Sequence, residues 1–136
     1  MINIYYPSED KIIELNILAL TLIKIKKGNV PKLLNYKKLS NILEDCKNKE
    51  GDIYDKAVVL FKGLIKGHVF ASGNRRTAFI VTRDFIMNNK EKFRIKNQAS
   101  EAKIMTGIRE DYYKDNEIKE WIKYGKIREF NRFGDM

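Results

Sequence analysis

The chain has 136 residues, of which 43% are hydrophobic and 33% are charged, and it contains only eight glycines and two prolines. This length and composition describe one soluble globular domain, exclude a disordered chain, and favour an all-α fold because few residues break helices. The 27 Lys and Arg against 18 Asp and Glu give a net charge of +9, which suits nucleic acid, nucleotides, phosphorylated ligands or an acidic protein partner.

A first helix is predicted to begin after Ser8, whose hydroxyl can cap it. Glu9 and Asp10 would then lie at the positive end of the helix dipole. Apolar residues recur at helical spacing as far as about Lys27, and they are Ile12, Ile13, Leu15, Leu18, Leu22 and Ile25. The Gly-Asn pair at 28–29 and the proline at 31 predict a loop after this helix.

Two further helices are predicted before residue 68. The first is short, lies around residues 39–46, and its segment ends near Gly51. Asp52 is expected to cap the next helix, "IYDKAVVLFKGLIKG", which Gly67 ends. Its apolar stripe consists of Ile53, Ala57, Leu60, Phe61 and Leu64.

A fourth helix is predicted to begin at about Asn74 and to continue through "RRTAFIVTRDFIMNN". Its strong apolar content indicates a central position, with Ala78, Val81, Phe85 and Ile86 facing inward. The segment 90–98 is expected to be an extended connection. Two closing helices follow over 99–111 and 115–130, and Asp115 is the expected N-cap of the second. The whole chain, 1–136, is therefore predicted to be one compact bundle of about six helices.

Cysteine usage and hydropathy predict a cytoplasmic protein. The single cysteine, Cys46, cannot form an intramolecular disulfide, and it is interpreted as a small residue on a helix face. The start of the chain lacks the pattern of a secretory signal, and the apolar stretch 15–23 is too short to span a bilayer, so no membrane association is expected.

The segment "GHVFASGNRRTA", residues 67–78, combines the features of a phosphate site with the only histidine of the chain. One helix ends there, a short loop follows, and the next helix begins with amides that lack intrahelical acceptors. Gly73 would allow close backbone approach, and Asn74, Arg75 and Arg76 would add donors. His68 can accept a proton near neutral pH. Together these residues predict a phosphoryl- or nucleotidyl-transfer site. The plainer alternative is a solvated basic helix boundary.

The stretch "HVFASGNRRTA" closely resembles the signature of the Fic (filamentation induced by cAMP) and Doc (death on curing) proteins. His68, Phe70, Gly73, Asn74 and Arg76 match that signature in identity and spacing. The resemblance implies a small helical bundle of the short, Doc-like branch, with the motif in a loop between two central helices. The segment "CKNKEGDIY" occupies the place of the family's flap, and it fits either a small hairpin or a surface loop.

The resemblance also implies roles for the matching residues. His68 would be the general base that takes a proton from a Ser, Thr or Tyr hydroxyl of a target protein. Phe70 would be a buried anchor of the loop. Gly73 and Asn74 would contribute to the anion hole for the phosphates of ATP, the co-substrate, and Arg76 would stabilise transition-state charge.

Two positions bear on the subclass. Family members that transfer AMP usually have Gly at the position of Arg75 and often a second Arg at the position of Phe79, whereas the Doc branch has Lys followed by Arg-Thr-Ala. Arg75 therefore favours transfer of the terminal phosphate. Ser72 stands where the family has an acidic residue that holds Mg²⁺. Because a serine hydroxyl is a poor ligand for a hard cation, metal binding stays open, and Ser72 is instead expected to donate to phosphate.

The leading hypothesis is a Doc-like toxin that phosphorylates a protein hydroxyl and is bound by a small antitoxin protein. Two alternatives are AMP transfer to a protein hydroxyl and a catalytically degenerate Fic-fold module that binds a nucleotide or a protein. A nucleic-acid-binding domain would rest on the +9 charge alone, since the sequence has no recognisable reader motif.

Overall fold

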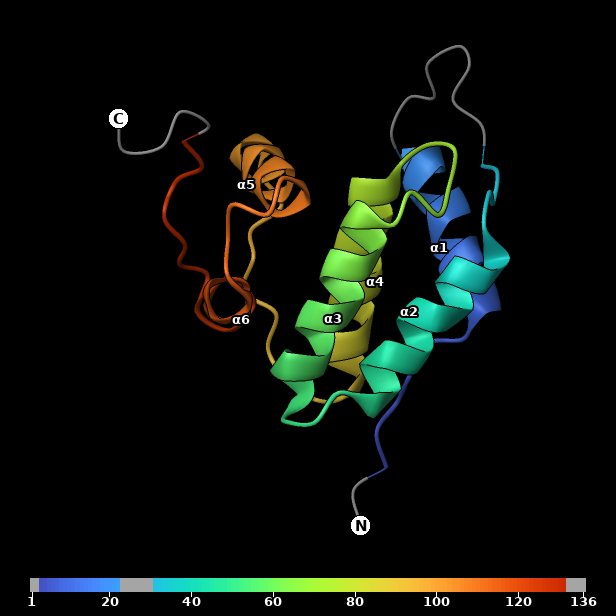
Figure 1. The fold of residues 1–136 in the computed structure, drawn as a ribbon, viewed down its shortest axis with the longest axis horizontal. Coiled ribbons are helices and arrows are strands. Elements are labelled where there is room, and N and C mark those ends of the chain that lie inside the picture. Colours follow the sequence, from blue (N-terminus) through green and yellow to red (C-terminus); the bar gives the residue numbers. More distant parts are fainter. Residues whose placement is uncertain (1–2, 23–30, 132–136) are drawn as a thin grey trace.

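The computed structural model describes residues 3–22 and 31–131, and within them the fold is all-helical, as predicted (Figure 1). The described part contains six helices: α1 (Glu9–Leu22), α2 (Tyr36–Asn48), α3 (Ile53–Lys66), α4 (Asn74–Asn88), α5 (Ala99–Arg109) and α6 (Asp115–Tyr124). α3 and α4 pack against each other at the centre, α1 and α2 cover one side of this pair, and α5 and α6 cover the other.

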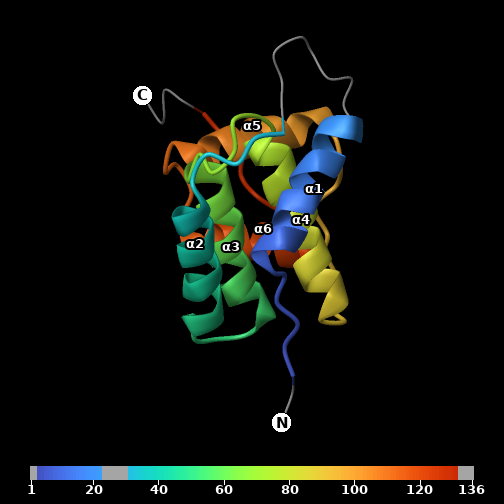
Figure 2. The ribbon, with the colours of Figure 1, turned by 90° about the vertical axis from the view of Figure 1, so that its right-hand side faces the viewer.

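The central pair supplies most of the core, as its apolar patterns predict. Leu60, Phe61 and Leu64 of α3 are buried, as are all four of the inward positions expected on α4: Ala78, Val81, Phe85 and Ile86. Turned by a quarter turn, the molecule shows α5 lying across the end of the central pair where α3 passes into α4 (Figure 2). Because of this crossing, α5 and the residues just before it lie next to the motif.

The predicted caps of α1 and α3 are confirmed. The Ser8 hydroxyl accepts a hydrogen bond from the Lys11 amide at 3.1 Å. Asp52 and Asp55 form a reciprocal capping box, in which each carboxylate accepts from the amide of the other, at 3.0 and 2.9 Å. α1 is described to Leu22, so the predicted end near Lys27 and the Gly-Asn stop lie outside the described residues.

α2 begins earlier than the predicted residue 39, because Asn35 caps it. The Asn35 side chain accepts from the Lys38 amide at 3.0 Å, so that the helix begins at Tyr36. The segment before it, residues 31–34, runs beside the motif loop, residues 67–73. The Leu34 amide donates to the Val69 carbonyl, and the Ala71 amide donates to the Lys32 carbonyl, both at 2.8 Å.

The sequence left residues 46–54 open between a small hairpin and a surface loop, and the structure shows no hairpin there. This segment is the end of α2, a short turn and the capped start of α3. Between the described residues the only β-pairing is one isolated antiparallel bridge, Leu33 to Phe70, which belongs to residues 31–34 and the motif loop.

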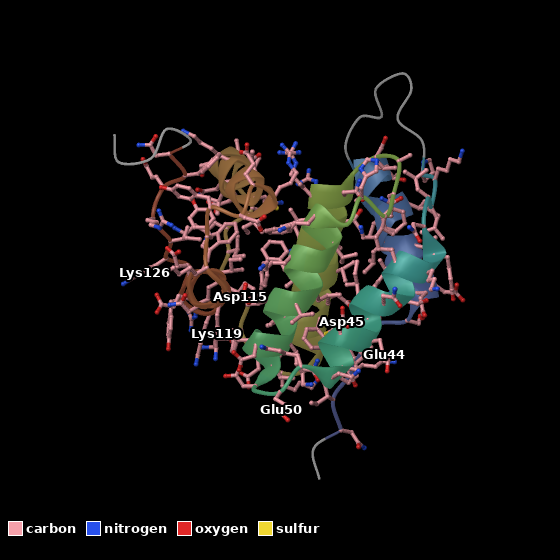
Figure 3. The ribbon with its side chains drawn as sticks, in the orientation of Figure 1. Glu44, Asp45, Glu50, Asp115, Lys119 and Lys126 are labelled. Atoms are coloured by element: carbon pink, nitrogen blue, oxygen red, sulfur yellow. The ribbon has the colours of Figure 1, made fainter. Side chains whose placement is uncertain are left out.

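The prediction that Asp115 caps α6 is wrong by one residue. Lys114 occupies the cap position, because its amide donates to the Glu117 carboxylate at 3.0 Å. Asp115 instead forms an ion pair with Lys62 of α3 at 2.7 Å. Lys119, one turn further along α6, pairs with Asp55 at 2.9 Å, so that charged side chains of α6 face α3 (Figure 3).

α6 also ends earlier than residue 130. Gly125 adopts φ +75°, and its amide donates to the Trp121 carbonyl at 2.8 Å, which closes the helix after Tyr124. A Cβ at Gly125 would lie 2.9 Å from the Arg94 carbonyl oxygen, so the chain also passes too closely here for a larger residue. In the part of the chain that the structure describes, no helix is long and apolar enough to cross a membrane.

Candidate functional site

The motif loop, residues 67–73, joins the two central helices and begins with an unusual backbone conformation. Gly67 closes α3 by donating its amide to the Gly63 carbonyl at 2.8 Å. His68 follows with φ +49°, a left-handed conformation that costs a non-glycine residue about 1–3 kcal/mol. Its side chain is exposed. The fold thus holds the only histidine outward on a strained backbone, which is an arrangement common at functional sites.

Phe70 and Asn74 hold the loop in shape. Phe70 is 1% exposed. The Phe70 amide donates to the Asn74 side-chain oxygen at 3.0 Å, and the Asn74 side-chain nitrogen donates to the Phe70 carbonyl at 2.8 Å. Phe70 is therefore placed as a buried anchor, and the Asn74 side chain is engaged with the loop. The backbone amide of Asn74, at the start of α4 where helix amides lack intrahelical acceptors, is the group that this residue can offer to an anion.

Gly73 is favoured by its backbone conformation, and it also lies close to α1. It has φ +74°, a region that glycine adopts without strain. A Cβ at this position would lie 3.0 Å from Leu20 Cδ2 and 3.5 Å from Asn16 Nδ2, both on α1. α1 therefore sets how closely the loop can approach the bundle. The carbonyl of Gly73 accepts the first bond of α4, from the Thr77 amide at 2.8 Å.

Asn16 is a site residue that sequence reasoning missed. It is 1% exposed on α1, and its side-chain nitrogen donates to the Ser72 carbonyl at 3.0 Å and to the Thr77 hydroxyl at 2.9 Å. The available signal was a polar residue within the apolar, inward-facing stripe of the first helix. A buried polar group is nearly always hydrogen-bonded, so such a residue indicates a fixed contact.

A cavity of about 790 Å³ opens at this loop. One wall is formed by the motif loop and the first turn of α4, and six predicted site residues contribute to it: His68, Ser72, Gly73, Asn74, Arg75 and Arg76. The opposite wall consists of α5 and the residues leading into it, including Asn97, Glu101, Met105 and Arg109. Phe79 also lines the cavity. The structure therefore brings the predicted phosphate-binding and proton-accepting residues to one hollow.

The two adjacent arginines reach across the cavity to the α5 wall. Arg75 Nη1 donates to the Thr106 hydroxyl at 2.7 Å, and Arg76 Nη1 donates to the Asn97 side-chain oxygen at 3.3 Å. Thr106 is itself oriented by donating to the Ala102 carbonyl at 3.1 Å. Both guanidinium groups are thus held beside the cavity, at the amino end of α4 where the helix dipole already favours anions.

The remaining charges of the cavity were also missed from the sequence. Lys66 and Arg109 line it together with the two arginines of the motif, whereas Glu101 is the one carboxylate among the lining residues. Lys66 forms an ion pair with Asp111 just beyond α5, and this contact lowers the pKa of that carboxyl. Even with Lys66 offset by Asp111, the lining has three arginines against one carboxylate and is positive.

The comparison with known families agrees with the motif. Residues 26–86 match the family model described as "Fic/DOC family". This match supports membership of the Fic/DOC family. The match includes the loop and α4 as far as Ile86, whereas the α5 wall lies outside it. A search of curated proteins found no match. Membership of the family supports a protein-modifying transferase in general terms.

The donors around the cavity do not fit a divalent cation held by the protein. Magnesium prefers carboxylate oxygens, and the lining residues supply only one carboxylate, on Glu101, besides neutral oxygens such as those of Ser72, Asn97 and Gln98. Across residues 3–22 and 31–131, no group of three or more His, Cys, Asp and Glu side chains is placed to hold a metal ion. No catalytic step is therefore assigned to a metal here.

Cys46 lies outside this cavity. It is fully buried on α2, and its thiol donates to the Lys56 carbonyl at 3.4 Å. Burial raises the pKa of this thiol from 9.0 to about 11, so it stays protonated at neutral pH. The residue therefore has the surroundings of a packing residue and not those of a nucleophile.

Proposed function

We propose that this protein transfers the terminal phosphoryl group of ATP to a hydroxyl side chain of a target protein. The observation that supports this most strongly is that His68 and the amino end of α4 line the same cavity. A proton acceptor and an anion site at one hollow are the two parts that phosphoryl transfer to a hydroxyl needs.

Each residue has a role in this proposal. The amides at the start of α4, together with Arg75 and Arg76, hold the phosphates. His68 takes the proton of the attacking hydroxyl. The hydroxyl oxygen forms a bond to the γ-phosphorus while the bond from that phosphorus to the bridging oxygen breaks, and ADP leaves. Asn16 and Phe70 keep the loop in place and do not touch the reacting atoms.

Transfer of the γ-phosphoryl group is preferred to transfer of AMP for two reasons. Arg75 resembles the Lys of the Doc branch. Phe79, where AMP-transferring members often have a second Arg, is 5% exposed and brings an apolar side chain to the cavity. An apolar residue offers no bond to phosphate oxygens, so this part of the cavity favours another portion of the nucleotide.

A second candidate is a nucleotide- or protein-binding module without catalysis. Ser72 favours it, because the carboxylate that holds Mg²⁺ in the family is absent at this position. In either case we propose a cytoplasmic protein. If the transferase is active, a small antitoxin protein would restrain it, and the positive surface around the cavity suits an acidic segment of such a partner.

The experiment compares label transfer from γ-labelled and α-labelled ATP to proteins of a cell lysate. The wild type, His68→Ala and a control, Tyr124→Ala at an exposed position outside the cavity, are tested side by side. The proposal expects γ-label on a target protein, lost in His68→Ala and kept in Tyr124→Ala. Transfer of α-label would show AMP transfer, and absence of both labels would favour the binding module.

A further inference from the structure

The α5 wall gives the cavity a charge pattern that the motif alone does not contain. Arg109 is the last residue of α5, and it lines the cavity together with Lys66 and the motif arginines. Glu101 lies eight residues earlier on the same helix, about 12 Å away along its axis. The only carboxylate of the lining, on Glu101, therefore lies near the opposite end of α5 from Arg109. It is not placed to bind a metal ion at the Arg109 end of the cavity.

The position of Arg109 is fixed by the packing of α5. Ile108 is buried beside it. A Cβ at Gly107 would lie 2.6 Å from Tyr113 Cε2 and 3.0 Å from the Phe130 ring, so this turn of α5 is pressed against the C-terminal segment. The Lys66–Asp111 ion pair ties the same end to α3. Arg109 therefore follows a closely packed turn of α5.

We propose that this site binds the phosphates of ATP directly through protein cations, with Arg109 as a third guanidinium beside Arg75 and Arg76, and without a divalent cation held by the protein. The inference rests on the proposed nucleotide site, but it concerns binding and not transfer. It assigns a binding role to a residue outside the segment matched by the family.

The charges that line the cavity set the direction in which Mg²⁺ changes ATP binding. Mg²⁺ neutralises part of the charge of the triphosphate. Where a protein has carboxylates to share that ion, the metal strengthens binding. Here the lining has three guanidinium groups and one carboxylate, besides Lys66, whose charge is paired with Asp111, so the more negative, metal-free nucleotide is attracted more strongly. Guanidinium groups also match phosphate oxygens with paired N–H donors.

The test is calorimetric titration of the full chain with ATP, in EDTA and in millimolar Mg²⁺, without any target protein. We expect the Kd in EDTA to be equal to or lower than the Kd in Mg²⁺. In Arg109→Ala the Kd for ATP should rise about tenfold, as for loss of one charge-assisted contact. The matched control is Arg83→Ala on α4, whose side chain does not line this cavity.

A gain-of-function variant tests the same inference from the other side. Ser72→Asp places a carboxylate beside the phosphates, so ATP binding should then become tighter in Mg²⁺ than in EDTA. Wild-type binding that is lost in EDTA, or an Arg109→Ala variant that binds as well as the wild type, would overturn the inference. Tight binding in EDTA without His68-dependent label transfer would support it while contradicting the proposed transferase.

Discussion

The side chain of Asn16 donates a hydrogen bond to the Ser72 carbonyl at 3.0 Å, which joins α1 to the motif loop across 56 positions of the sequence. The same nitrogen donates to the Thr77 hydroxyl at 2.9 Å, in the first part of α4. One buried amide thus fixes both ends of the turn that presents the start of α4. The proposed anion site therefore depends on a residue that lies outside the motif.

Replacing Asn16 by Leu should destabilise the protein and weaken ATP binding together. The change leaves the Ser72 carbonyl and the Thr77 hydroxyl without their common partner, at a cost of about 1–3 kcal/mol in the free energy of unfolding. Urea unfolding and ATP titration measure the two effects. Asn41→Leu, at an exposed position of α2, is the control. Equal unfolding midpoints for Asn16→Leu and the wild type would contradict the assignment.

Gly73→Ala should lower stability by about 1–2 kcal/mol, because alanine is strained at φ +74°. Its methyl group would also meet Leu20 Cδ2 at 3.0 Å. A double-mutant cycle with Leu20→Ala separates the two causes. If backbone strain dominates, the second change relieves none of the loss. If the close contact dominates, Gly73→Ala costs less free energy in the Leu20→Ala background than in the wild type.

The local features of the fold were predictable because their signals are local in sequence. Ser8 and Asp52 are short polar residues directly before helices, and each caps its helix as expected. The same reasoning failed at Asp115. Glu117, three residues after Lys114, satisfies the amide of Lys114, and Asp115 is drawn to Lys62 on another helix. A cap is therefore predictable only where no distant partner competes for the side chain.

The motif wall of the cavity was predictable for the same reason, whereas the α5 wall was not. His68 and Arg76 lie within nine consecutive residues, so their proximity follows from the chain. Arg109 and Asn97 reach the cavity only because α5 crosses the end of the central helices. No spacing in the sequence predicts that crossing, and an exposed arginine near a helix end is ordinary in a basic protein.

The burial of Cys46 makes a prediction about pH. Its pKa is raised from 9.0 in an ordinary thiol to about 11 in the fold, so the folded protein keeps a proton that the unfolded chain loses between these values. The stability contributed by Cys46 is therefore fully present below pH 9 and declines as pH rises toward 11. The difference in unfolding free energy between wild type and Cys46→Ala should shrink over this range. A difference that stays constant would contradict the prediction.

The bond from Arg75 Nη1 to the Thr106 hydroxyl, at 2.7 Å, predicts that Thr106 positions the arginine for phosphate. Thr106→Val keeps the shape of the side chain and removes the acceptor, so the Kd for ATP should rise about threefold, as for loss of one hydrogen bond. Thr106→Ser keeps the acceptor and should bind ATP as the wild type does. In an Arg75→Ala background Thr106→Val should have no further effect, because no guanidinium remains to be positioned. Valine and serine variants with the same Kd would show that the Thr106 hydroxyl does not position Arg75 for phosphate.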